Sequence, residues 1–254
     1  MLLAIDVGNT HTVIGCYEGR TLVDDWRITT RATRTADELG VLIAQLFRGR
    51  REQSMPVDAA IVSSVVPSLT ETFVTMVERT FDVKCRVVGP GLKTGMPILY
   101  ENPREVGADR IVNAVAAYER WPTGLIIVDF GTATTFDVVT PDGEYLGGAI
   151  TPGVGIASDA LFRHAARLPR VEFARPKSVI GRNTVASIQS GLVYGYVALV
   201  EGLVQRMRDH LDFECTVVAT GGLAHRIARE TDAIEHVDER LTLDGLNLLH
   251  ERNR

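Results

Sequence analysis

The sequence of 254 residues has few cysteines, and its three, Cys16, Cys85 and Cys215, lie far apart with no C-x-x-C pair. This spacing argues against a zinc site and a disulfide framework, and it suits a reducing cytosol. No apolar run approaches the roughly 20 residues that a membrane-spanning helix needs, and the chain reaches Asp6 without the basic leader of a signal peptide. We therefore expect a cytoplasmic protein with no membrane partner.

Positive charge is scarce as well, because 27 Lys and Arg against 32 Asp and Glu give a net charge of −5. Proteins that bind nucleic acid usually carry a basic excess or stripe. The nearest feature is the short Arg-Gly-Arg-Arg cluster at 48–51, which we interpret as a solvated helix end. We expect no nucleic-acid partner. An acidic protein that binds phosphate has to use backbone N–H groups and metal ions more than bulk charge.

Several familiar nucleotide-binding and catalytic motifs are also missing. The chain has no G-x-x-x-x-G-K-[ST] loop, no G-x-G-x-x-G after a strand and no H-R-D with D-F-G. It also lacks H-E-x-x-H and G-x-S-x-G. These absences exclude P-loop, Rossmann, protein-kinase and esterase interpretations.

The most informative feature that is present is an internal repeat, in which segment 2–15 resembles segment 125–138. The aligned pairs are Asp6 with Asp129, Gly8 with Gly131, Asn9 with Thr132 and Thr12 with Thr135. Each copy is an apolar strand, an Asp-x-Gly turn and a return strand, followed by a second turn and a third strand. Alternating helical and strand patterns follow, including helices at 36–50, 67–80, 110–121, 184–209, 223–230 and 241–251. The pattern predicts an α/β protein of two duplicated domains, 1–118 and 119–254, that face each other across a cleft.

The two Asp-x-Gly turns suit phosphoryl transfer. Glycine lets the backbone approach phosphate oxygens, and N–H groups from Gly8 onward can cradle them. Asn9, Thr10 and Thr12 add neutral donors, and a carboxylate at Asp6 can hold Mg²⁺ directly or through water. His11 lies within the same turn, so we consider it a possible nucleotide contact.

Gly107-Ala108-Asp109-Arg110 precedes a strongly helical run and has two interpretations. In the structural one, Asp109 is the N-cap of the helix. In the functional one, Asp109 is the base for a substrate hydroxyl, and Arg110 grips a carboxylate.

Small residues recur every four positions in the long helix, at Ser187, Gly191 and Gly195. Glycine is costly in a helix, so a close contact should offset that cost. The contact lies either within the monomer or with the same helix of a second copy. Val217 to Leu223 similarly fits either a tight strand-to-helix turn or a close approach to a nucleotide.

Taken together, the motifs closely resemble type III pantothenate kinase, a bacterial family of the acetate/sugar kinase–Hsc70–actin superfamily. The resemblance covers essentially the whole chain. Its motifs are Asp6-Val7-Gly8-Asn9-Thr10, Gly107-Ala108-Asp109-Arg110, Asp129-Phe130-Gly131-Thr132-Ala133-Thr134-Thr135, Gly147-Gly148-Ala149-Ile150-Thr151-Pro152-Gly153, Gly181-Arg182-Asn183-Thr184 and Thr220-Gly221-Gly222.

This resemblance implies two ribonuclease H-like, actin-like ATPase domains around a nucleotide cleft. It implies phosphorylation of pantothenate by ATP, the first step of coenzyme A synthesis, by a cytoplasmic homodimer that needs Mg²⁺ and K⁺ or NH₄⁺. It also implies site residues. For ATP they are Asp6, Val7, Gly8, Asn9, Thr10, His11, Thr12, Val13 and Thr132; for pantothenate they are Tyr100, Gly107, Ala108, Asp109, Arg110 and Thr184, the last reaching across the dimer.

The same resemblance makes Asp109 the proton acceptor, Asp129 the monovalent-cation ligand and Asp6 the Mg²⁺ side of the site. Two alternatives remain open. One is another small-molecule kinase of the superfamily, acting on acetate or a sugar. The other is a regulatory protein that binds nucleotide without catalysis.

Overall fold

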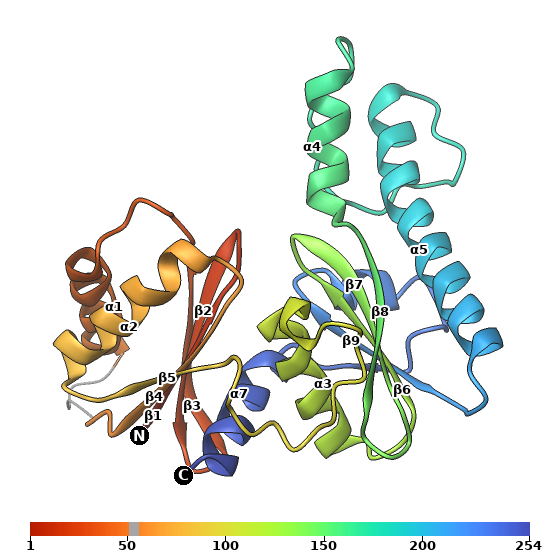
Figure 1. Cartoon of the computed structure of the whole chain (residues 1–254). Helices are drawn as coiled ribbons and strands as arrows, with labels where there is room; N and C mark the ends of the chain where they lie inside the picture. Colours follow the sequence, from red (N-terminus) through yellow and green to blue (C-terminus); the bar gives the residue numbers. More distant parts are fainter. Residues whose placement is uncertain (51–55) are drawn as a thin grey trace. The chain divides into compact units, whose positions relative to one another are not determined.

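The computed structural model describes residues 1–50 and 56–254 (Figure 1). Arg51, the last residue of the basic cluster, lies outside these ranges. The chain forms two compact units, Met1–Glu119 with Arg240–Arg254, and Arg120–Glu239.

The first unit is built on a five-stranded sheet with the order β3-β2-β1-β4-β5. Its strands are β1 (Leu2–Val7), β2 (His11–Glu18), β3 (Thr21–Thr29), β4 (Ala59–Ser64) and β5 (Cys85–Val87). The first three strands form the predicted antiparallel meander, and β4 and β5 add to β1 in parallel. Helices α1 (Ala36–Arg50) and α2 (Pro67–Phe81) bury one face of the sheet in an apolar core.

The start of α1 follows from local sequence. The Glu38 N–H donates to the Thr35 hydroxyl at 3.3 Å, and the Thr35 N–H donates to the Glu38 carboxylate at 2.8 Å. This reciprocal pair is the predicted capping box. The Thr35 N–H and the Thr35 hydroxyl both donate to the Glu38 carboxylate, and these two hydrogen bonds, with a smaller contribution from the nearby Arg34, lower the pKa of the Glu38 carboxyl.

Helices α3 (Ala108–Arg120) and α7 (Leu241–Arg252) complete the first unit, and a short 3₁₀ turn, η1 (Pro103–Glu105), precedes α3. Helix α7 packs on β1, β2 and β4, and the Thr242 hydroxyl donates to the Asn113 side chain of α3 at 2.7 Å. The sequence division at residues 118 and 119 had assigned this C-terminal helix to the second half. Its apolar face instead packs on the first sheet, and nothing in an amphipathic pattern specifies which sheet a helix covers.

The second unit repeats the topology, with the sheet order β10-β9-β6-β7-β8. Its strands are β6 (Leu125–Phe130), β7 (Ala133–Val139), β8 (Tyr145–Pro152), β9 (Thr216–Gly221) and β10 (His236–Val237). Helices α5 (Thr184–His210) and α6 (Ala224–Ala228) pack with one face of this sheet in a second core. The duplication predicted from the repeat is therefore present, strand for strand.

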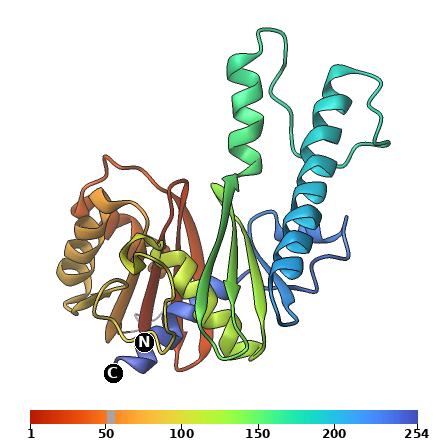
Figure 2. The same ribbon diagram turned by 45° about the vertical axis from the view of Figure 1, so that its right-hand side comes forward.

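Helix α4 (Val154–His164) and the N-terminal part of α5 extend beyond the second sheet (Figures 1 and 2). Sequence reasoning missed α4, which follows Pro152 and Gly153 and buries only Val154.

Helix α5 is long and apolar enough to cross a membrane by length and composition alone, with a mean hydropathy of 1.2. The expectation that no apolar run approaches the length of a membrane-spanning helix was therefore wrong for α5. Because 44% of its most apolar stretch is buried and residues such as Val200 pack in the second core, α5 has the character of a core helix.

Candidate functional site

The first Asp-x-Gly turn joins β1 to β2, with Asp6 near the end of β1. The main-chain register places Val13 of β2 and Ser63 of β4 directly beside Asp6, so the three side chains share one face of the sheet. The hydroxyl oxygen of Ser63 is buried and has no hydrogen-bond partner within the described residues. A half-buried carboxylate and an unpaired hydroxyl therefore lie on the same face.

The turn itself is closed by the Gly8 N–H, which donates to the His11 carbonyl at 3.1 Å. A methyl group at position 8 would lie 2.9 Å from that carbonyl oxygen, so the turn favours glycine. Asn9, Thr10 and His11 are exposed. The residues predicted to bind phosphate are thus gathered in one accessible hairpin.

Thr12 differs from expectation, because its side chain is fully buried. It points to the core face, and its hydroxyl shares a 2.9 Å hydrogen bond with the Thr30 hydroxyl. The Thr30 N–H in turn donates to the Thr10 carbonyl at 3.0 Å. The loop after β3 therefore supports the turn, and the Thr12 hydroxyl stabilises it from within instead of facing a ligand.

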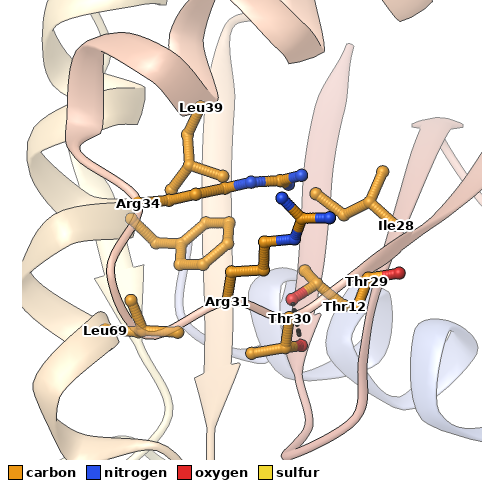
Figure 3. Close-up of a pocket in the computed structure, with 9 residues that line it drawn as sticks. Thr12, Ile28, Thr29, Thr30, Arg31, Arg34, Leu39 and Leu69 are labelled. Carbon is orange, nitrogen blue, oxygen red and sulfur yellow. Dashed lines mark hydrogen bonds between the residues drawn. The ribbon is translucent and has the colours of Figure 1, made fainter.

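A narrow pocket next to the hydrogen bond between Thr12 and Thr30 is lined by two positively charged side chains (Figure 3). Figure 3 shows the guanidinium groups of Arg31 and Arg34 beside each other, near the bonded pair Thr12 and Thr30. The Nη1 atom of Arg34 is buried without a hydrogen-bond partner in the described chain. Sequence reasoning missed this feature, since the two arginines stand in a polar loop with no motif.

The Gly107–Arg110 segment opens α3, but Asp109 is not the N-cap. The Gly107 carbonyl accepts from the N–H groups of Arg110 and Ile111 at 3.1 and 3.3 Å, so Gly107 is the capping residue. Asp109 lies one residue inside the helix, and its carboxylate accepts the Arg110 N–H at 2.8 Å. The N-cap interpretation was therefore wrong by two residues, because the helical hydrogen bonds already begin at the Gly107 carbonyl.

This arrangement fixes a carboxylate in the first turn of a helix, where the exposed N–H groups favour negative charge. A methyl group at position 107 would lie 2.6 Å from the Asp109 carboxylate, so glycine leaves room for it. Arg110 is buried, with 7% of its surface exposed, and Tyr100 of the same unit is half-buried. Asp109 itself is half-buried, so it is held in place while part of it stays accessible.

The second Asp-x-Gly turn is one residue shorter than the first. The Gly131 N–H donates to the Ala133 carbonyl at 3.0 Å, and Phe130 pairs with Thr134 where Val7 pairs with Thr12. Thr134 is therefore the structural equivalent of Thr12, and both side chains are fully buried. The predicted alignment of Thr12 with Thr135 was wrong because sequence similarity does not show a one-residue deletion inside a turn.

Asp129 lies close to two glycine-containing segments. Gly221 has φ of +90°, and a methyl group there would lie 2.5 Å from the Asp129 carboxylate. The Gly153 N–H donates to the Thr132 carbonyl at 3.1 Å. The glycines of two separate motifs thus allow close packing around one turn. Gly221 ends β9 and α6 begins at Ala224, so the interpretation of Val217 to Leu223 as a tight strand-to-helix turn is confirmed.

A buried polar network missed by sequence reasoning adjoins this turn. The Thr135 hydroxyl donates to one oxygen of the Asp137 carboxylate at 3.1 Å, and the Tyr145 hydroxyl donates to the other at 2.6 Å. Asp137 is only 1% exposed. The sequence signal that could have revealed this network is the alternation of Thr135 and Asp137 on the strand that pairs with the strand of Asp129.

Thr184 is exposed at the first residue of α5, after Asn183, whose side chain accepts the Ala186 N–H at 2.8 Å. Along the same helix, the Tyr196 hydroxyl donates to the Pro152 carbonyl at 2.8 Å, next to the second turn. Tyr196 lies twelve positions after Thr184 in the helix, a rise of about 18 Å. Within its own unit, Thr184 is therefore remote from Thr132.

The small-residue face of α5 is open at its two glycines. Methyl groups at Gly191 and Gly195 would meet no atom of the described residues within 4 Å, so these two glycines make no close contact within the monomer. Ser187 differs, because its hydroxyl donates to the Gly181 carbonyl at 3.4 Å. Seven of the ten large apolar side chains that are exposed in the described residues lie in this part of the chain. They are Ile150, Ile156, Leu161, Phe162, Val179, Ile180 and Val185.

Comparison with known proteins gives one consistent result. A family model described as type III pantothenate kinase matches residues 2–206. Proteins named type III pantothenate kinase from an Anaeromyxobacter species and from Myxococcus xanthus are 66% and 61% identical to this chain, and each comparison covers 100% of this chain and at least 99% of the relative.

Solved structures show the fold at much lower identity. A conserved putative Baf family transcriptional activator from Campylobacter jejuni has a TM-score of 0.62 at 18% identity, covering 99% of this chain and 98% of the other. A polyphosphate/ATP-glucomannokinase from an Arthrobacter species has a TM-score of 0.52 at 14% identity, covering 99% and 98%. These likenesses and the two equivalent sheets agree with the predicted ribonuclease H-like, actin-like fold.

Proposed function

Because the chain belongs to the type III pantothenate kinase family, we propose a role in that family's reaction for each residue described above. The chain catalyses the ATP-dependent phosphorylation of pantothenate to 4'-phosphopantothenate, the first step of coenzyme A biosynthesis. The observation that carries this conclusion is the match of the whole chain at 66% identity.

The first turn, Asp6 to Val13, binds the ATP phosphates through its accessible backbone and the side chains of Asn9, Thr10 and His11. Thr12 contributes through its main chain, since its hydroxyl is committed to Thr30. The half-buried Asp6 carboxylate with the unpaired Ser63 hydroxyl fits a hydrated Mg²⁺ on that face. The ion, when bound, neutralises charge on the phosphate oxygens.

Asp109 is the proton acceptor for the primary hydroxyl of pantothenate. As the hydroxyl oxygen forms its bond to the γ-phosphorus of ATP, the bond to the β-γ bridging oxygen breaks, ADP leaves with that electron pair, and the hydroxyl proton passes to Asp109. The 2.8 Å hydrogen bond from the Arg110 N–H fixes the carboxylate for this step. Tyr100, Gly107, Ala108 and Arg110 form the rest of the pantothenate site, in which a guanidinium suits the substrate carboxylate.

The second unit supplies Thr132 as a further nucleotide contact and Asp129 as the ligand of a monovalent cation, K⁺ or NH₄⁺. Support for the cation comes from the donor set around Asp129, which consists of a carboxylate with hydroxyl oxygens on both neighbouring strands. When bound, such an ion supplies positive charge for anionic oxygens of the nucleotide.

The enzyme works as a homodimer in which Thr184 serves the pantothenate site of the second copy. The open glycines of α5, Gly191 and Gly195, and the exposed apolar side chains of residues 150–185 support this proposal, since such patches usually mark interfaces. The rise of about 18 Å from the second turn to Thr184 also favours a role away from its own unit's turn.

We place the enzyme in the cytoplasm, and three free cysteines support this location. Burial raises the pKa of the Cys85 thiol to about 12, and burial also raises the pKa of the Cys215 thiol. Thiols of this kind stay protonated and unreactive at neutral pH. They therefore act as small apolar side chains.

A coupled assay of ADP release tests the function. With Mg²⁺, K⁺ and ATP, we expect turnover on pantothenate and none on acetate or hexoses; turnover on those acceptors in place of pantothenate would establish a different kinase. Asp109→Asn should lower kcat by about 10²–10⁴-fold, the usual contribution of a general base, with ATP affinity unchanged. Glu119→Gln, on the same helix, is the control. A wild-type protein that binds ATP without any turnover would favour the regulatory alternative.

A further inference from the structure

The two Asp-x-Gly turns differ in what lies beside the carboxylate. In the first unit, Asp6 pairs across the hairpin with Val13; in the second, Asp129 pairs with Thr135. The difference arises because the second turn is one residue shorter, and a shift of one residue moves a strand's side chains to the opposite face. Asp6 therefore has an isopropyl group as its cross-strand neighbour, whereas Asp129 has a hydroxyl.

Directly facing residues of antiparallel strands have Cβ atoms about 4.5–5.5 Å apart, close enough for both side chains to contact one ligand. Thr135 is half-buried. Thr220 of β9 pairs with Asp129 from the other side and is 2% exposed. Asp129 is thus flanked by hydroxyl-bearing residues on both neighbouring strands of the sheet.

Asp137 sets the polarity of the Thr135 hydroxyl, that is, the direction in which the hydroxyl donates its proton. A hydroxyl has one proton and two lone pairs, and Thr135 donates its proton to the Asp137 carboxylate at 3.1 Å. No other side-chain hydrogen bond of Thr135 occurs within residues 1–50 and 56–254. The Tyr145 hydroxyl takes the second Asp137 oxygen at 2.6 Å, so Asp137 is an acceptor for both neighbours.

The Thr135 oxygen is left with lone pairs and no proton to offer a ligand. Such an oxygen attracts a cation and repels the oxygens of a phosphate group. Resting on the cation role proposed for Asp129, we propose that the Thr135 hydroxyl oxygen is a second ligand of the monovalent cation, and that Asp137 is a positioning residue that fixes its polarity. The Asp6 turn lacks this ligand because Val13 occupies the equivalent place.

Binding of Tl⁺, which has nearly the radius of K⁺, tests the proposal without relying on turnover. Titrations followed by ²⁰⁵Tl NMR are run on the full-length protein in tetramethylammonium buffer, with and without a non-hydrolysable ATP analogue. Thr135→Val should weaken Tl⁺ binding by about tenfold or more, in line with the loss of one charge-assisted contact. Thr135→Ser keeps the oxygen and should stay within about twofold of wild type.

Thr134→Val is the matched control, because it makes the same change on the same strand but on the buried core face. It should leave Tl⁺ affinity unchanged. Asp137→Asn tests the positioning role: an amide N–H can donate to the Thr135 oxygen, so Tl⁺ affinity should fall while affinity for the ATP analogue holds. Melting curves without monovalent cation show whether each variant is folded.

Unchanged Tl⁺ affinity in Thr135→Val, or an equal loss in Thr134→Val, would overturn the role of Thr135. Loss in Thr135→Val with no loss in Asp137→Asn would overturn the role of Asp137. If the wild type phosphorylates pantothenate but binds no Tl⁺, the cation site is wrong and the enzymatic function stands. If it binds Tl⁺ through Thr135 but does not phosphorylate pantothenate, the function is wrong and the cation site stands.

Discussion

The equivalent threonines Thr12 and Thr134 should respond to the same substitution with opposite sign. Both are fully buried on the core face of their sheets, but Thr12 shares a 2.9 Å hydrogen bond with Thr30. The Thr134 hydroxyl oxygen has no partner in the described part of the chain. Valine has nearly the same shape as threonine, so the comparison isolates the hydroxyl group.

An unpaired buried hydroxyl costs about 1–3 kcal/mol in lost hydration, and a typical hydrogen bond contributes about 0.5–1.5 kcal/mol. We therefore expect Thr134→Val to raise the free energy of unfolding of its unit by about 1 kcal/mol. For a chain of this size, that corresponds to a rise in Tm of about 2–4 °C. Thr12→Val should instead lower the stability of its unit by about 1 kcal/mol.

Differential scanning calorimetry of both variants, followed transition by transition, measures these effects, since two units need not unfold as one. Thr12→Ser, which keeps the hydroxyl, should recover part of the loss caused by Thr12→Val. Equal destabilisation by both valine substitutions would refute the reasoning, because it would mean that the Thr134 hydroxyl is as well satisfied as that of Thr12.

Two further predictions concern packing and pH. A methyl group at position 153 would lie 2.6 Å from the Gly131 carbonyl oxygen and closer still to that of Thr132. Gly153→Ala should therefore lower the free energy of unfolding by about 1–3 kcal/mol and weaken ADP binding measured by calorimetry. Gly155→Ala is the control, because its methyl group meets open space and should change neither quantity. Burial, and secondly the neighbouring Arg86, lowers the pKa of His250. Below pH about 6.5, the ordinary pKa of histidine, the unfolded chain therefore binds more protons than the folded one. The contribution of His250 to the free energy of unfolding is complete above that pH and is lost as the pH falls below it, by at most about 1.4 kcal/mol per pH unit. Urea unfolding at pH 7.5 and 5.5 should show this loss in the wild type and a smaller one in His250→Gln; equal losses would contradict it.

Features specified by neighbouring residues were predictable from the sequence. The capping box of Thr35 and Glu38 needs only residues three apart, and the paired meanders follow from an alternating pattern that occurs twice. The exposed hairpin around Asp6 follows in the same way. The resemblance to a known family supplied the reaction itself.

Features that depend on register or on distant packing were not predictable. The alignment of Thr12 with Thr135 failed because one residue is missing from the second turn. The capping role went to Gly107 and not Asp109, since both residues suit a helix start and only the backbone decides between them. The packing of α7 on the first sheet depends on tertiary contacts such as that of Thr242 with Asn113.

The position of α7 has a consequence for how the protein is made. The first unit includes residues 240–254, so its sheet lacks one covering helix until the whole of Arg120–Glu239 has left the ribosome. At about 5–20 residues per second, these residues take about 6–24 s to synthesise. During that time the apolar surface on β1, β2 and β4 is open to chaperones and proteases. A chain that stops before residue 240 leaves this surface uncovered.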